Sequence, residues 1–524
     1  MRSGFALTMY RFAAFPHRTA GGITRPAARS LILSFVAGIF FAAVLAAQAQ
    51  ESIEPDILPS LAEPPAAPTE SLPSTPTEPL PALPQSVPSI APEPLPSSGA
   101  ALPSSEEAFP SSPKPLSSSM NYTGGYTTVV PAPVPAGPNG VVSGRNVFPG
   151  AEVDSGEPRR FYYRLLLTVR GVWDDNIFIS HTNRVSDYYF AIEPQITIGV
   201  GDIEGRNKSY LRLDYMPSVI LYVDHSNQDG VNQLIHLEGG YSTGRWTFRA
   251  AEDIALLDSA NLNSFFDTTG LWANTDASGP TRVNIFSTRL RADYQLTGKV
   301  YLQGEFDSWT YFYPDNISSY TIAGGLYVYY NWLPKVSVGI GGTVGYEWVD
   351  DPTPNQPFEQ INVRLNYEAT AKLGLYASAG VEFRQFDGDR GTYTTPVFEI
   401  GASYYPFSGT ILTLAAGRRI YSSGYLPGQD FGSTYVVGRF QQRLFQRVYL
   451  GLGVGYENSD YFATTDGVSA TRNDDYWFIE PSVDVLITRW LSAGVYYLHR
   501  EDNSNFDFSS FYDNQVGVRA TLRF

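Results

Sequence analysis

Apolar and polar residues alternate without interruption in the stretch Ile361-Asn362-Val363-Arg364-Leu365-Asn366-Tyr367-Glu368. Successive side chains of a β-strand point to opposite faces, so this period of two predicts a strand with one apolar and one polar face. The same period recurs in residues 286–295, where Thr288 is the one exception, and in residues 448–457. Alternation alone is also compatible with a soluble β-sandwich.

The connections between these stretches favour a different architecture. One set is short: 243–244, 297–298, 333–334, 372–374, 406–409, 446–447 and 489–490, with 201–207 somewhat longer. The intervening connections are long, polar and rich in Asp, Asn, Ser and Gly: 258–280, 350–357, 388–392, 422–432, 459–475 and 501–511. Short and long connections that alternate along the chain are typical of a transmembrane barrel with short periplasmic turns and longer outer loops.

We therefore predict an all-β fold, a transmembrane antiparallel up-and-down β-barrel over residues 158–524. About 18 strands are expected, with 16 as the alternative, since strand boundaries are the least certain part of such a prediction. The expected strands are 161–174, 186–200, 207–222, 232–242, 245–257, 281–296, 299–313, 318–332, 335–348, 358–371, 374–386, 393–405, 409–421, 433–445, 447–458, 475–487, 490–500 and 511–524.

A barrel of this size is too wide for side chains to fill, so its polar face is expected to line an aqueous lumen. The lumen-facing candidates are the charged residues of the polar rows: Arg289, Arg291, Arg364, Glu368, Glu382, Arg384, Arg439 and Arg443. The opposite rows carry little charge and end in aromatic residues such as Trp332, Trp348 and Trp490. Aromatic residues at strand ends match the interfacial girdles of outer-membrane barrels.

The composition agrees with a protein of the bacterial envelope. The chain has 524 residues and no cysteine, which excludes disulfides, thiolate metal sites and a lipid-modified N-terminal cysteine. Its net charge of −16 argues against nucleic acid as a partner. Aromatic residues make up 14% of the chain and charged residues only 17%, below the usual quarter of charged residues in soluble domains.

Two segments precede the predicted barrel. Residues 1–49 combine five arginines, an apolar run at 31–47 and the small-x-small sequence Ala47-Gln48-Ala49, which predicts a secretory signal peptide rather than a retained anchor. Residues 50–157 are rich in Pro, Ser and Ala, with 23 of the 38 prolines between positions 51 and 150. This composition predicts a disordered periplasmic tether, either a plain linker or a strap that touches peptidoglycan or a periplasmic partner.

The last strand carries an independent indication. Val516, Val518, Ala520, Leu522 and Phe524 form an apolar row that ends in phenylalanine. This pattern resembles the signal read by the bacterial outer-membrane assembly machinery, with Val518, Ala520, Leu522 and Phe524 as its central residues. The resemblance implies that machinery as a partner, besides outer-membrane lipid and lipopolysaccharide.

A family resemblance rests on Val169-Arg170-Gly171-Val172-Trp173-Asp174-Asp175-Asn176-Ile177-Phe178-Ile179-Ser180, followed by Ser186-Asp187-Tyr188-Tyr189-Phe190-Ala191-Ile192-Glu193-Pro194. A first strand that ends in an Asp-Asn turn, before a second strand that carries a proline, resembles the opening of the β-barrel porin 2 family. The resemblance implies an outer-membrane barrel of porin-like type and names no solute. It also implies an association with exopolysaccharide export systems.

Catalytic and metal-binding chemistry is not expected. His181, His225, His236 and His499 have no accompanying nucleophile motif, so we predict no enzyme activity and no cofactor. Asp174-Asp175-Asn176 and Asn473-Asp474-Asp475 could bind calcium, but their spacing is not that of a calcium loop, which favours turn chemistry and no metal.

Two classes of function remain open on the sequence. The first is a porin-like channel for small hydrophilic solutes, in which the loop at 258–280 could fold into the lumen. The second is a structural or assembly anchor whose Pro-rich tether holds a periplasmic partner. An exopolysaccharide-export role rests on the family association alone.

Deletion of Phe524 tests the assembly signal. The change removes one interfacial aromatic residue, a small loss of folding free energy, yet we expect it to reduce strongly the amount of folded, heat-modifiable barrel in outer-membrane fractions. Thr521→Ala, on the opposite face of the same strand, should leave assembly nearly unchanged. Equal yields from the two variants would contradict the signal.

Overall fold

The structure, a computed structural model, describes residues 161–201, 209–258, 276, 281–370, 372–386, 391–407, 409–445 and 447–524, without the side chains of 368–370. The predicted signal peptide at 1–49, the Pro-rich tether at 50–157 and the side chain of Glu368 lie outside these residues. None of the described helices is long and apolar enough to cross a membrane.

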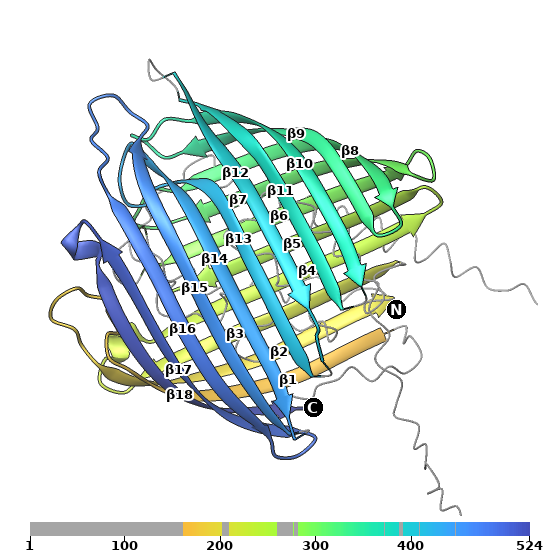
Figure 1. Ribbon diagram of the computed structural model, residues 1–524. Coiled ribbons are helices and arrows are strands. Elements are labelled where there is room, and N and C mark those ends of the chain that lie inside the picture. The colour runs from red at the N-terminus through yellow and green to blue at the C-terminus, as the bar shows by residue number, and fades with distance from the viewer. Residues whose placement is uncertain are drawn as a thin grey trace, which may run out of the picture. The chain divides into compact units, whose positions relative to one another are not determined.

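The described chain forms 18 antiparallel strands (Figure 1). They are β1 (Phe161–Asp174), β2 (Asp187–Gly201), β3 (Tyr210–Tyr222), β4 (Gly230–Thr243), β5 (Trp246–Leu257), β6 (Val283–Gln295), β7 (Val300–Phe312), β8 (Ser319–Leu333), β9 (Val336–Val349), β10 (Gln356–Thr370), β11 (Leu373–Gln385), β12 (Thr392–Tyr404), β13 (Thr410–Ser422), β14 (Gln429–Leu444), β15 (Val448–Ala463), β16 (Asn473–Leu486), β17 (Leu491–Ser504) and β18 (Phe511–Arg523). Two 3-10 helices, η1 (Ser226–Gln228) and η3 (Asp507–Ser509), lie in loops.

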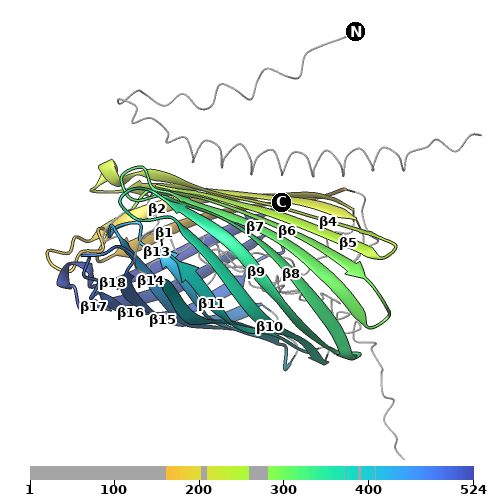
Figure 2. The ribbon, with the colours of Figure 1, turned by 90° about the horizontal axis from the view of Figure 1, so that it is seen from above.

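Each strand pairs with its neighbours in sequence, and β1 also pairs with β18, so the sheet closes into a barrel (Figure 2). The closing register runs from Leu166↔Arg523 to Asp174↔Gln515. A closed ring leaves no strand edge with unpaired backbone groups. The prediction of 18 strands is confirmed, and the alternative of 16 is wrong.

The closing strands are also joined by side chains. The hydroxyls of Thr168 and Thr521 are 2.9 Å apart and buried. Thr521→Ser retains this hydroxyl and is therefore a closer control than Thr521→Ala for the deletion of Phe524.

The expected strand boundaries differ most at the end of the barrel that carries the long loops. There β14 begins at Gln429 instead of 433, β15 continues to Ala463 instead of 458, and β17 continues to Ser504 instead of 500. Gln429 pairs with Ala463 across the ladder. Backbone pairing therefore continues beyond the point where the apolar row, on which the prediction depended, has ended.

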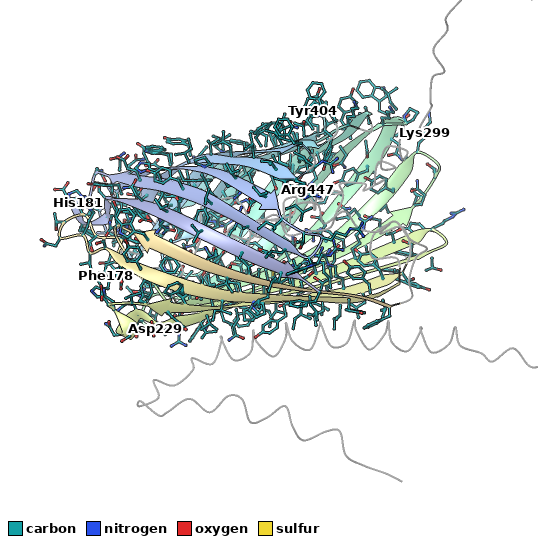
Figure 3. All side chains as sticks on the ribbon, turned by 90° about the horizontal axis from the view of Figure 1, so that it is seen from below. Phe178, His181, Asp229, Lys299, Tyr404 and Arg447 are labelled. Atoms are coloured by element: carbon teal, nitrogen blue, oxygen red, sulfur yellow. The ribbon has the colours of Figure 1, made fainter. Side chains whose placement is uncertain are left out.

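The two faces of the barrel follow the alternation of the sequence. Along β10, Ile361 and Val363 are 61% and 50% exposed, whereas the alternating residues Asn362 and Arg364 are buried. Figure 3 shows His181 and Asp229 at the end with the long loops and Lys299 at the end with the short turns. Trp332 is 68% exposed at that short-turn end.

The outer face has a carboxylate within the apolar row of β5. Glu252 of β5 lies opposite Thr288 of β6, and the Thr288 hydroxyl donates a 2.6 Å hydrogen bond to Glu252 Oε2. Thr288 is the residue that interrupts the apolar row of 286–295. Its hydroxyl satisfies an acceptor that would otherwise face an apolar surrounding.

Three positions on the inner row of β9 are glycines, and aromatic side chains of the neighbouring strands lie across them. Tyr327 of β8 and Phe358 of β10 are 0% and 1% exposed. A Cβ on Gly341 would come within 3.0 Å of Tyr327 and of the Leu326 carbonyl, and a Cβ on Gly345 would come within 3.0 Å of Phe358. These positions have no room for a larger residue.

Gly341→Ala should therefore destabilise the barrel, by about 1–3 kcal/mol, because the added methyl meets a backbone carbonyl as well as a side chain. Gly401→Ala is the matched control, since a Cβ there meets nothing within 4 Å. Urea unfolding of the refolded protein in detergent measures the free energy of unfolding of both variants. Equal losses of stability would show that the aromatic packing over β9 is not the constraint.

Candidate functional site

The inner wall carries ion pairs between strands that are not adjacent. Arg364 of β10 binds Glu305 of β7, with Arg364 Nη1 2.7 Å from Glu305 Oε1. Arg291 of β6 also reaches Glu305, with its Nε 3.2 Å from Oε1, and its Nη2 is 3.0 Å from Asp307 Oδ1. Strands β7 and β10 are separated by two others in the ring. Such a contact can form only across the concave inner face, which places these side chains in the lumen.

A second network joins β9, β10, β11 and β14. Arg384 Nη1 is 2.7 Å from Glu347 Oε2, and Arg384 Nε is 2.8 Å from Glu382 Oε1. Gln356 Nε2 donates a 3.0 Å hydrogen bond to Asp430 Oδ1 across the wall. Nearly every charge in this group therefore has an opposite charge or an amide beside it, which offsets the cost of removing it from water.

The remaining candidates lie on the same inner rows. Arg289 Nη2 is 2.5 Å from Asp253 Oδ2, and Asp253 also binds His236 Nδ1 at 2.6 Å. Arg439 of β14 lies against the inner face at Gly453, and Arg443 lies beside Gly409. Seven of the eight lumen-facing candidates are thus placed on the inner face.

The acidic partners Glu305, Asp307 and Glu347 were not among the candidates. Their strands alternate in the same way as 361–368, so the complete polar rows would have included them. The choice of partner could not be read from the sequence, because it depends on which strands face each other across the ring.

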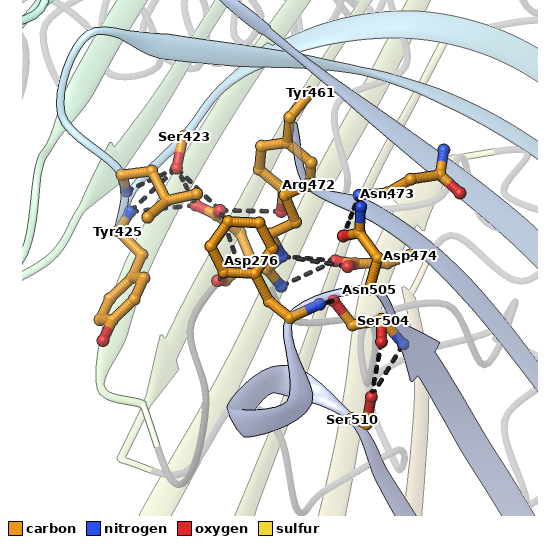
Figure 4. A network of polar contacts seen from close by, with 12 residues as sticks. Asp276, Ser423, Tyr425, Tyr461, Arg472, Asn473, Asp474, Ser504, Asn505 and Ser510 are labelled. Atoms are coloured by element: carbon orange, nitrogen blue, oxygen red, sulfur yellow. Dashed lines mark hydrogen bonds and ion pairs between the residues drawn. The ribbon is translucent and has the colours of Figure 1, made fainter. Parts of the chain in front are cut away.

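The mouth at the long-loop end contains a polar network centred on Asp276 (Figure 4). Its carboxylate accepts hydrogen bonds from Ser423 Oγ at 2.7 Å, Tyr461 Oη at 2.9 Å and the Tyr425 backbone N–H at 3.0 Å. Arg472 Nη1 donates to the Asp276 backbone oxygen at 2.8 Å. Burial raises the pKa of the Asp276 carboxyl, and Arg472, Ser423 and Tyr461 oppose that rise.

The position of Asp276 matters because it belongs to the connection between β5 and β6. Its partners come from the β13–β14 loop, from β15 and from the residue before β16. β14 lies nine strands from β5 in an 18-strand ring, which is the opposite wall. This connection therefore has a fixed contact with the opposite side of the mouth. Most of the predicted pore loop at 258–280 lies outside the described residues.

Other loops meet at the same place. Ile317, between β7 and β8, donates its backbone N–H to the Gly424 carbonyl at 2.8 Å. Gly428 donates its backbone N–H to Thr353 Oγ1, between β9 and β10, at 2.9 Å. The β13–β14 loop thus binds segments from three other parts of the ring.

Three of the described histidines have an acidic or amide partner. His225 Nδ1 is 2.9 Å from Asp187 Oδ2 at the rim, and His236 is paired with Asp253 on the inner wall. His499 binds Asn514 on the outer row, with its Nδ1 2.8 Å from Asn514 Oδ1. Within the described residues, no serine or threonine hydroxyl hydrogen-bonds the His225 ring.

No family model matches the chain, and no curated protein matches it. Among solved structures, it is similar to OccK3 (OpdO) of Pseudomonas aeruginosa, with 11% identity, a TM-score of 0.36 and coverage of 69% of this chain and 96% of that one. OpdK of the same organism, solved with vanillate, has 12% identity, a TM-score of 0.35 and coverage of 69% and 99%. OccAB3 of Acinetobacter baumannii has 11% identity, a TM-score of 0.35 and the same coverage. The fold assignment rests on the strand pairing within the chain itself.

The Asp276 contact can be tested directly because the natural chain has no cysteine. Asp276→Cys combined with Ser423→Cys should form a disulfide on mild oxidation, detected by non-reducing electrophoresis and mass spectrometry. Asp276→Cys with Asp258→Cys should not, since Asp258 stays at its own wall, where it accepts a hydrogen bond from the Val231 backbone N–H at 3.0 Å. The opposite result would place Asp276 on the β5 side of the mouth.

Proposed function

We propose that this protein is an outer-membrane channel of porin-like type for small hydrophilic solutes. The observation that carries the proposal is a closed 18-strand ring with an apolar outer face and ion pairs along its inner wall. An 18-strand barrel is wide enough to hold water as well as side chains. An inner wall of charges favours polar solutes and ions over apolar ones.

The membrane assignment is supported by the outer surface. Phe190, Val344 and Val518 are 54%, 63% and 58% exposed in the middle of the outer rows. So many exposed apolar side chains, found on all the strands except β6, would promote aggregation in water, whereas lipid accommodates them. Trp332 and Trp490 at the short-turn end fit an interfacial girdle. The short turns would then face the periplasm, together with the N-terminal Pro-rich segment.

The contacts between loops across the mouth support a selective channel rather than an open pore. Solutes that pass the mouth meet the Asp276 network first and the ion-paired wall afterwards. Both contain positively and negatively charged side chains as well as hydrogen-bond donors and acceptors, which suits small polar molecules. The opening motif at Val169–Ser180, with its resemblance to the β-barrel porin 2 family, points to the same class.

Planar-bilayer recording of the purified protein tests this function. We expect stable single-channel steps, and a larger conductance after deletion of residues 261–277, because the deletion removes Asp276 and its contacts with the opposite side of the mouth. A folded barrel that gives no steps, with and without the deletion, would favour the structural-anchor function instead. Steps of unchanged size after the deletion would retain the channel and exclude this loop as its constriction.

A further inference from the structure

Three carboxylates meet where the barrel closes. Asp174 ends β1, Asp175 follows it, and Asp513 lies near the start of β18. One carboxylate oxygen of each lies within 4.8 Å of the other two. Asp174 and Asp513 are both 0% exposed, so these charges are held away from bulk water.

The closing ladder forces the three groups together. Asp174 is paired with Gln515 across the β1–β18 register. The Asp175 backbone N–H donates to the Asn514 carbonyl at 3.1 Å, and the Asn514 backbone N–H donates to Asp175 Oδ1 at 2.8 Å. Asp174 Oδ1 accepts the Asn176 backbone N–H at 2.8 Å, which is the turn chemistry expected for this sequence. The cluster therefore exists only when the barrel is closed.

A fourth side chain points into the cluster and is incompletely satisfied. Gln515 is 0% exposed, and its Nε2 lies 3.0 Å from Asp174 Oδ2 and 3.1 Å from Asp513 Oδ2. Its Oε1 is buried without a hydrogen-bond partner, and so is Asp513 Oδ1. A buried acceptor without a donor is costly. The two ends of a glutamine amide have nearly the same shape, so rotation of the amide would turn its carbonyl oxygen toward the carboxylates.

The cations around the cluster do not balance it. Arg500 Nε is 2.5 Å from Asp513 Oδ2 and is buried, whereas Arg184 Nη1 is 3.3 Å from Asp175 Oδ2 and is partly exposed. No guanidinium within the described residues forms an ion pair with Asp174. Three carboxylates thus lie beside two guanidinium groups, so the cluster keeps an excess of negative charge that a further cation would offset.

We propose that Asp174, Asp175 and Asp513, with the side-chain carbonyl of Gln515, form a calcium site that bridges the first and last strands. All ligand atoms are oxygens, which suits a hard divalent cation. Calcium fits better than magnesium because it accepts irregular arrangements of carboxylates and carbonyls, whereas magnesium requires near-octahedral geometry. The site lies at the long-loop end, on the side of the membrane where calcium modules work at dissociation constants of about 10⁻⁴–10⁻³ M.

The functional consequence is a cation-dependent closure of the barrel. Calcium would bind the closed state and have no complete site in the open or unfolded chain, so it would stabilise the closed state by mass action. This inference concerns the stability of the barrel and does not depend on conduction.

Thermal unfolding of the refolded full-length protein in detergent tests the site. One sample contains about 10 mM calcium chloride, which exceeds the expected dissociation constants, and the other contains EDTA. We expect calcium to raise the Tm of the natural protein by a few degrees and magnesium to raise it less. Asp513→Asn should lose the calcium effect. Asp507→Asn is the matched control and should retain it, since Asp507 is an exposed carboxylate in the adjacent β17–β18 loop.

A gain-of-function variant keeps the test decisive if Asp513→Asn does not fold. Gln515→Glu adds a carboxylate ligand, so half-maximal stabilisation should require roughly tenfold less calcium, with a lower Tm in EDTA. The proposal is overturned if calcium leaves the Tm of the natural protein unchanged or shifts Asp513→Asn equally. It is also overturned if Asp513→Asn raises the Tm without calcium and calcium has no effect, which would mean that Asp174 and Asp513 share a proton.

Discussion

The pairing of β1 with β18 is the constraint on which the rest of the molecule depends. Without it, two strand edges would present unpaired N–H and C=O groups to lipid, at several kcal/mol for each group. Its register also determines which side chains of the two strands face the lumen and which face outward. A shift by one residue would turn Arg170 and Arg519 from the lumen to the outer surface and Val169 and Val518 inward. Closure and the polarity of the lumen are therefore one structural requirement.

The charged lumen follows from that polarity. Arg170 Nε binds both oxygens of Glu193 at 3.0 Å and its Nη1 binds Tyr496 Oη, also at 3.0 Å, which ties β1 to β2 and to β17. Arg519 is paired with Asp484 in the same manner, with its Nε 2.7 Å from Oδ1. Pairs of this kind hold their side chains against the wall, where they cost less than isolated ions.

The sequence predicted what depends on neighbouring residues, and it could not predict what depends on the curvature of the ring. The period of two in 361–368 identified strands and faces, and the alternation of connections identified 18 strands. The contact of Asp276 with Ser423 joins residues 147 positions apart, and that with Arg472 joins residues 196 apart. Such contacts can be predicted only when the number of strands that separate the two residues around the ring is known.

The two ends of the closing pair are held by different chemistry. At the short-turn end, Thr168 and Thr521 join the strands through neutral hydroxyls, whose strength does not depend on the surrounding ions. At the long-loop end, the strands meet through the buried carboxylates of Asp174 and Asp513, and Arg500 forms an ion pair with Asp513. The strength of the closing contact at the short-turn end is therefore independent of the ions in the medium. On the side of the mouth, the calcium site that we propose would make this strength depend on the ions of the medium.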